Sequence, residues 1–199
     1  MSGWMVMTLR CVVNRLGAKL TMRVTLYVTS IVMLAGCVGI PEGITPVKSF
    51  DQSRYLGQWY EIARLDHSFE RGLSSISATY TVREDGHIRV VNRGYDPEEG
   101  IWRDAIGVAK FVDAPDIAHL KVSFFGPFYG SYVVFELGEA YDYALVTSYN
   151  RDYFWFLSRT PTVDESLRQH VLGRAHALGF ATEKMIWPSH AMTPKDPVL

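Results

Sequence analysis

From Gly57 onward, apolar and polar residues alternate in short runs that predict a succession of β-strands. In SISATYTV, residues 75–82, one face carries Ile76, Ala78 and Tyr80 while the other carries serine and threonine. Turn signals such as Asp85-Gly86 end such runs. The other runs are GQWYEIARL, HIRVVNRGY, IWRDAIGVAKFV, AHLKVSFFG, GSYVVFELG, YDYALVTSY and DYFWFLSR. Eight short strands with tight sequential turns predict an all-β fold, either a sandwich or an antiparallel up-and-down barrel.

One helix is predicted after the last strand, at residues 162–178. Its apolar residues recur every three to four positions and form a single stripe that needs a surface to lie on. They are Val163, Leu167, Val171, Ala175 and Leu178. Thr162 and Glu165 have the spacing of a capping box, and Gly179 supplies a C-terminal stop. We therefore expect this helix to pack on the sheet.

The N-terminal stretch MRVTLYVTSIVMLAGC predicts a secretory signal. Arg23 precedes an apolar run at residues 24–34, which is too short to span a bilayer as a helix, and small residues follow. A buried core helix is the alternative interpretation. We expect a signal peptide at 1–36, with residues 1–21 an over-called start and Met22 the initiator. A tether at 37–52, a barrel domain at 53–190 and a flexible tail at 191–199 complete the expected organisation.

The tetrapeptide LAGC, residues 34–37, resembles the bacterial lipobox. That resemblance implies cleavage after Gly36 and lipidation of Cys37, whose several acyl chains exceed the two signals that stable anchoring needs. The next residue is Val38 and not Asp, which in enteric-type sorting indicates the outer membrane. We expect a lipid-anchored protein on the periplasmic face of the outer membrane.

Charge and cysteine content exclude two classes of protein. Residues 1–36 hold four basic and no acidic side chains, so the rest of the chain has a net charge of −5. This mildly acidic body lacks the basic footprint of a nucleic-acid-binding protein. The only cysteines are Cys11 and Cys37, so no disulfide framework is expected in the body.

The common catalytic and cofactor motifs are absent from the sequence, including G-x-S-x-G, H-E-x-x-H and G-x-G-x-x-G. The histidines are scattered and predict no metal site; they are His67, His87, His119, His170, His176 and His190. We expect no catalytic residue and no cofactor. The loop LDHSFERG carries Asp66, His67, Glu70 and Arg71. Three interpretations of this loop remain: an acid–base cluster, a lid that meets lipid headgroups, or a solvated charged loop.

Three ordered motifs resemble those of the lipocalins. GQWYEIAR (Gly57, Trp59, Tyr60) is similar to the G-x-W motif, and YDYALVTSY (Asp142, Tyr143) to the second motif, with Tyr141 in place of the usual threonine. LSRTPT supplies the third motif, at Arg159. Over residues 50–187 the chain most resembles bacterial outer-membrane lipoprotein lipocalins, relatives of apolipoprotein D. The resemblance implies a closed eight-stranded barrel whose narrow end is closed by Trp59, with Arg159 lying across the indole as a cation–π pair.

The resemblance also implies a hydrophobic ligand inside the barrel, a fatty acid or a lysophospholipid, carried or stored in cell-envelope maintenance. The candidate lining residues are Ile76, Ala78, Tyr80, Val90, Val122, Phe124, Tyr132, Val134 and Trp155. Which strand face points inward is left open, because one bulge reverses it. Two alternatives remain, a structural lipoprotein with a filled barrel and a lipocalin-fold enzyme, which needs a nucleophile or a titrating pair inside the cavity. A homodimer is kept as an alternative to a monomer.

Overall fold

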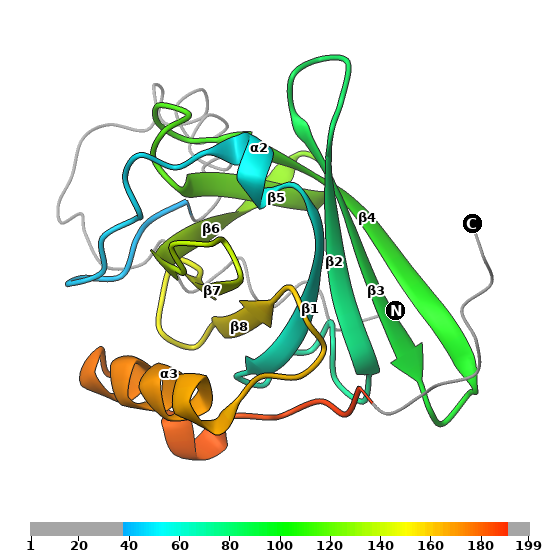
Figure 1. The fold of residues 1–199 in the computed structure, drawn as a ribbon. Helices are drawn as coiled ribbons and strands as arrows, with labels where there is room; N and C mark the ends of the chain where they lie inside the picture. Colours follow the sequence, from blue (N-terminus) through cyan, green and yellow to red (C-terminus); the bar gives the residue numbers. More distant parts are fainter. Residues whose placement is uncertain (1–37, 191–199) are drawn as a thin grey trace, which may run out of the picture.

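The computed structural model describes residues 38–190, in which eight antiparallel strands close into a barrel (Figure 1). Each strand pairs with the next along the chain, and β8 pairs with β1. The barrel predicted from the sequence is confirmed, and the sandwich alternative is wrong. The strands are β1 (Gly57–Arg64), β2 (Ser74–Val82), β3 (Ile88–Asp96), β4 (Ile101–Phe111), β5 (His119–Phe125), β6 (Phe128–Leu137), β7 (Tyr143–Thr147) and β8 (Phe154–Ser158).

The barrel has two different ends, because alternate connections of an up-and-down barrel lie at the same end. We call the end where β1 begins the floor; the short helix α2 (Gln52–Tyr55) precedes it. We call the opposite end the mouth. The connections at the mouth are residues 65–73, 97–100, 126–127 and 148–153.

The strand register assigns the inner face of the barrel. Directly paired residues of an antiparallel sheet share a face, and Ala78 pairs with Asn92, which pairs with Ala105. Ala78 belongs to a buried apolar cluster that also contains Trp59 and Tyr80. A second cluster lies on the outer face, between the barrel wall and the C-terminal helix, and includes Val133, Phe135, Phe154, Phe156 and Val171.

Helix α3 (Glu165–Ala177) covers this outer cluster. The predicted stripe is confirmed: Val171 and Ala175 are fully buried, and the other three members pack beside them. The predicted capping box is wrong, because Asp164 is the N-cap and its carboxylate accepts from the Leu167 N–H at 2.7 Å. The helix begins at Glu165, two residues later than a cap at Thr162 would require, and the Asp164 carboxylate complements the helix dipole.

Residues 38–50 differ from the extended tether that the sequence indicated. Ile44 and Phe50 are buried, and the Val47 N–H donates to the Val134 carbonyl at 2.9 Å. The Val38 carbonyl lies 3.1 Å from Nε2 of the buried His119. The segment therefore packs along the barrel, because its few apolar residues join the two buried clusters, which composition alone does not reveal.

After α3, a 3-10 turn η2 (Thr182–Lys184) leads to Ile186, which forms a β-bridge with Arg64. The predicted signal peptide, Cys37 and the tail at 191–199 lie outside the described residues. Between Val38 and His190, no helix is long and apolar enough to cross a bilayer.

Candidate functional site

The floor of the barrel is closed by Trp59 and Arg159. The guanidinium carbon of Arg159 lies 3.8 Å from the centre of the Trp59 ring, and the indole N–H donates to the Tyr55 carbonyl at 2.8 Å. Arg159 also donates to the carbonyls of Arg54, Gln58 and Tyr141. Because Trp59 is fully buried, this end of the barrel is sealed by side chains.

Gly57 allows Arg159 to take that position. Its φ of +92° lies in the left-handed region that side chains disfavour, and a Cβ there would meet Nη1 of Arg159 at 3.4 Å. The second motif contributes through its backbone, since the Arg159 N–H donates to the Asp142 carbonyl at 2.8 Å. Tyr60 and Tyr143 face outward and pack against the outer cluster.

Eight of the nine candidate lining residues belong to the inner cluster or pack directly on it. They are Ala78, Tyr80, Val90, Val122, Phe124, Tyr132, Val134 and Trp155. Ile76, the ninth, is also buried, but it lies outside that cluster, beside Gly94, where a Cβ would meet Ile76 at 3.4 Å and Leu73 at 2.9 Å. Gly94 thus makes room for Leu73, the last residue of the loop at the mouth.

Solvent reaches one part of the inner face and not the other. Near the floor, Trp59 and Ala144 of the inner cluster have no exposed surface. Toward the mouth, the inward positions Asn92, Val122 and Phe124 are half-buried, and Ala105 and Gly130 are exposed. Ala105 and Gly130 have little or no side chain, so they fill little of the interior beside β4 and β6. The barrel is therefore packed at its floor and open to solvent on its inner wall nearer the mouth.

Three tyrosine hydroxyl groups meet inside the barrel. Tyr132 Oη lies 2.7 Å from Tyr55 Oη and 2.9 Å from Tyr80 Oη. Burial raises the pKa of Tyr80 to about 12 and raises the pKa of Tyr55 and Tyr132 well above the usual value. All three therefore remain protonated at neutral pH and present hydroxyl groups within the barrel.

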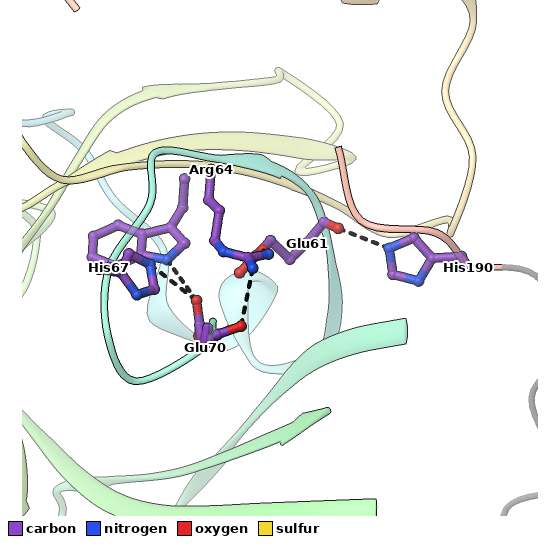
Figure 2. A network of polar contacts seen from close by, with 6 residues as sticks. Glu61, Arg64, His67, Glu70 and His190 are labelled. Carbon is purple, nitrogen blue, oxygen red and sulfur yellow. Dashed lines mark hydrogen bonds and ion pairs between the residues drawn. The ribbon is translucent and has the colours of Figure 1, made fainter. Parts of the chain in front are cut away.

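A buried polar cluster of Glu61, Arg64, His67 and Glu70 lies at the mouth end of the inner face (Figure 2). A bulge in β1 between Glu61 and Ala63 explains how two charged residues three apart share the inward face. Arg64 Nη1 donates to Glu61 Oε1 at 2.7 Å, and Arg64 Nη2 donates to the Glu70 carbonyl at 2.9 Å. The Glu61 carbonyl accepts from His190 Nε2 at 2.7 Å (Figure 2).

The loop at residues 65–73 contributes the other half of the cluster and covers it. Its charged residues divide between two sides: His67 and Glu70 turn inward and are buried, while Asp66 and Arg71 form an exposed ion pair of 2.6 Å. Glu70 Oε2 accepts from the Trp155 indole N–H at 3.2 Å. The buried side of this loop has the titratable groups of the acid–base interpretation, and its other side is the solvated charged surface of the alternative.

Burial sets the protonation states of the cluster. It raises the pKa of Glu61 well above the usual range, and repulsion from Glu70 raises it further, against the lowering effect of Arg64. Burial likewise raises the pKa of Glu70. It lowers the pKa of His67 to about 4, although Glu61 and Asp66 favour the charged imidazole. At neutral pH the imidazole is therefore uncharged, and the carboxyl pair beside the single cation of Arg64 binds a proton more readily than exposed glutamates do.

Several polar atoms of the cluster lack a hydrogen-bond partner among the described residues. They are Nε of Arg64 and both ring nitrogens of His67. His67 Nε2 lies 3.1 Å from Glu70 Oε2 without the geometry of a hydrogen bond, and the uncharged ring forms no ion pair with this carboxyl group at neutral pH. Groups of three or more potential metal-ligating side chains with suitable geometry do not occur within residues 38–190.

Sequence reasoning missed Glu61 and Arg64 as interior residues. Strict alternation from Trp59 places Glu61 inside but Arg64 outside, and the bulge reverses the second assignment. The charge of these residues also favoured a solvent-facing position. The available signal was the pairing of a glutamate and an arginine within an otherwise apolar run, YEIAR, since charges inside a strand of that kind are buried only when they are paired.

The mouth itself carries exposed aromatic side chains. Phe69, Phe125 and Phe128 are 45%, 67% and 60% exposed, and each lies on or beside a connection at this end. Phe69 stacks on His67 with ring centres 3.9 Å apart. The mouth thus carries exposed apolar side chains, one of which, Phe69, packs directly on the buried polar cluster.

Comparison with known proteins places this architecture. A family model described as a lipocalin-like domain matches residues 50–190. The chain is 52% identical to the outer membrane lipoprotein Blc of Vibrio cholerae, over 83% of this chain and 98% of that protein. It is 32% identical to mouse apolipoprotein D, over 74% of this chain and 80% of that one. Insecticyanin from the tobacco hornworm has the same fold, with a TM-score of 0.60 at 20% identity over 76% of this chain and 86% of that chain.

Proposed function

The chain belongs to the lipocalin family, and from this premise we propose that it is an outer-membrane lipoprotein that holds a single-chain lipid, a fatty acid or a lysophospholipid, inside its barrel. The names of the Vibrio cholerae and Escherichia coli relatives support the location. So does Cys37, which ends the lipobox-like LAGC and would carry the anchor. Carriage or storage of such a lipid in envelope maintenance is the role that we propose.

The observation that carries the proposal is that part of the inner wall of the barrel is exposed to solvent. Ala105 faces inward and is exposed, while inward residues near the floor are fully buried. A barrel filled by its own side chains would bury both sets alike. Eight strands enclose an interior that suits one small ligand, and the candidate lining residues on this wall are apolar or aromatic.

The energetics favour a ligand with an acyl chain. Burial of about fifteen methylene groups at roughly 0.8 kcal/mol each gives about 12 kcal/mol before the costs of association. Those costs amount to several kcal/mol, which leaves micromolar or tighter affinity. The exposed Phe69, Phe125 and Phe128 at the mouth would contact a chain on its way in.

Native mass spectrometry of the protein released gently from membranes tests the proposal. We expect a bound lipid of acyl-chain mass, and we expect the stripped protein to rebind palmitate or lysophospholipid with quenching of its intrinsic tryptophan fluorescence. Ala105→Trp, which fills the inner wall, should abolish rebinding. Ile106→Trp is the matched control, because Ile106 is 58% exposed on the opposite face of the same strand.

Two results would contradict the proposal. Failure of the folded protein to take up any fatty acid or lysophospholipid would favour a structural lipoprotein. Equal binding by both tryptophan variants would show that the lipid does not lie against the inner wall.

A second candidate function, a lipid-modifying enzyme, is favoured by one observation. The carboxyl pair of Glu61 and Glu70 is the kind of titrating pair inside the barrel that acid–base chemistry needs. Mass spectrometry of lipids recovered after prolonged incubation distinguishes the two functions. A carrier returns its ligand with unchanged mass and chromatographic position, whereas an enzyme returns a product.

A further inference from the structure

The polar cluster is the feature of the barrel that acyl-chain binding leaves unexplained. Glu61 and Arg64 have side chains only 3% and 2% exposed, and Nε of Arg64 has no hydrogen-bond partner among the described residues. Buried polar atoms are almost always satisfied, and an exception calls for a missing partner. The cluster thus has the composition of a binding site for a polar group.

We propose that the polar cluster receives the polar end of the bound lipid and selects an end group that donates hydrogen bonds, a hydroxyl or a primary ammonium, over a carboxylate. The inference rests on the proposed function, because it assigns the other end of the same ligand. It names the headgroup chemistry that the inner wall does not determine.

Position supports this assignment. Trp155 packs on the inner cluster, and its indole N–H donates to Glu70, so one side chain joins the apolar wall to the polar cluster. Glu61 pairs with Leu157, a member of the same inner cluster. A lipid whose chain lies on the inner wall therefore has its end group beside Glu61 and Glu70, beneath the loop at residues 65–73.

The donor and acceptor inventory selects the end group. Two carboxyl groups offer several acceptor lone pairs, of which Arg64 and Trp155 use only some. The unpartnered Arg64 Nε–H is a donor that a hydroxyl oxygen can satisfy while its own hydrogen bonds to a glutamate. A carboxylate would add a third acidic group around a single guanidinium, and like charges at such distances repel strongly.

Proton balance gives the proposal a direct signature. Glu61 and Glu70 are two buried carboxyl groups beside the one guanidinium of Arg64, so a single proton on the empty pair balances the charge. The raised pKa of both glutamates favours that proton. An ammonium takes the place of that proton: its N–H groups bond to both carboxylates, and one H⁺ leaves to solvent. A fatty acid binds only in its neutral form, so its carboxylate takes up one H⁺. A monoacylglycerol exchanges none.

Isothermal calorimetry with the full protein, stripped of lipid and held in an amphipathic polymer, measures both affinity and protons. The probes are hexadecylamine, monopalmitoylglycerol and palmitate, each titrated at pH 7 in two buffers of different ionisation enthalpy. We expect the amine and the glycerol ester to bind at least about tenfold more tightly than palmitate. We expect release of about one proton with the amine and uptake of about one with palmitate.

Glu70→Gln keeps the shape of the side chain and removes one carboxyl group. It should abolish the proton release and reduce the preference for the amine over palmitate about tenfold. Glu98→Gln is the matched control, because Glu98 is an exposed carboxylate at the same mouth, in the turn after β3. It should leave both quantities unchanged. If Glu70→Gln does not fold, the proton counts of the unaltered protein still decide the question.

The outcomes separate this inference from the proposed function. Binding of all three probes with equal affinity and no proton exchange would overturn the inference and leave the proposed function intact, with the end group in solvent at the mouth. Tighter binding of palmitate would also overturn it. Failure of every probe to bind would count against the proposed function itself.

Discussion

Arg159 holds its guanidinium carbon 3.8 Å from the centre of the Trp59 ring and donates hydrogen bonds to three backbone carbonyls around it. The contact therefore does more than a surface cation–π pair. It fixes α2, the start of β1 and the turn before β7 around one buried indole, and so seals the floor below the solvent-reached wall.

Arg159→Met should lower the free energy of unfolding by about 3–5 kcal/mol, because it removes the cation–π contact and several charged hydrogen bonds together. Arg168→Met is the control. Arg168 lies 3.9 Å from the ring of Trp187 on the outside of the molecule. Its replacement by Met should lower the free energy of unfolding by about 1 kcal/mol or less. Urea unfolding measures both. Equal losses would mean that the carbonyl contacts contribute nothing.

The barrel and its helix followed from sequence because their signals are periodic. Strand alternation, turn residues and the stripe from Val163 to Leu178 each repeat, so single irregularities do not hide them. The closed floor was predicted from the three lipocalin-like motifs, which occur along the chain in the expected order. Two features were missed because they depend on single events: the bulge that turns Arg64 inward, and the packing of Ile44, which the flanking prolines and glycines of its segment concealed.

Arg64→Met should lower the free energy of unfolding by about 3–5 kcal/mol at pH 8, because it leaves the negative charge of the Glu61 and Glu70 pair buried without a cation. The cost should shrink toward pH 5, where the pair can take up a second proton. Glu61→Gln should cost less at both values, because Arg64 keeps its contact with the Glu70 carbonyl and gains an uncharged acceptor. Denaturant titrations at the two pH values measure these costs. A pH-independent cost for Arg64→Met would contradict the assignment of a shared proton.

His67 should make the protein less stable in acid. Its folded-state pKa is about 4 against 6.5 in a free side chain, so between these values the unfolded chain binds a proton that the folded chain excludes. Stability therefore rises with pH through this window, by about 3 kcal/mol in full. The raised pKa of Glu61 and Glu70 gives the opposite slope above about pH 4.5, since there the folded state holds the extra proton.

A comparison with His67→Gln isolates the histidine, because the charged groups near position 67 are the same in both proteins; they are Glu61, Arg64, Asp66 and Glu70. The stability advantage of the unaltered protein over the variant should fall by about 3 kcal/mol between pH 7 and pH 4. Thermal unfolding across that range measures it. A constant difference would mean that His67 is not held neutral under the loop at the mouth.

The packed N-terminal segment limits how far the barrel can stand from the lipid anchor that we propose at Cys37. A free chain of residues 38–52 would reach about 50 Å, but Ile44 is buried against the outer cluster, and Lys48 forms a β-bridge with Ile117. Trypsin cleavage after Lys48 should therefore be slow in the native protein. Ile44→Asp should lose about 2 kcal/mol of local packing and accelerate cleavage roughly thirtyfold, whereas the neighbouring Thr45→Asp, at an exposed position, should not. Equal acceleration by both variants would mean that charge in the segment, and not the loss of a buried side chain, controls its release, and the barrel would then stand free of its anchor.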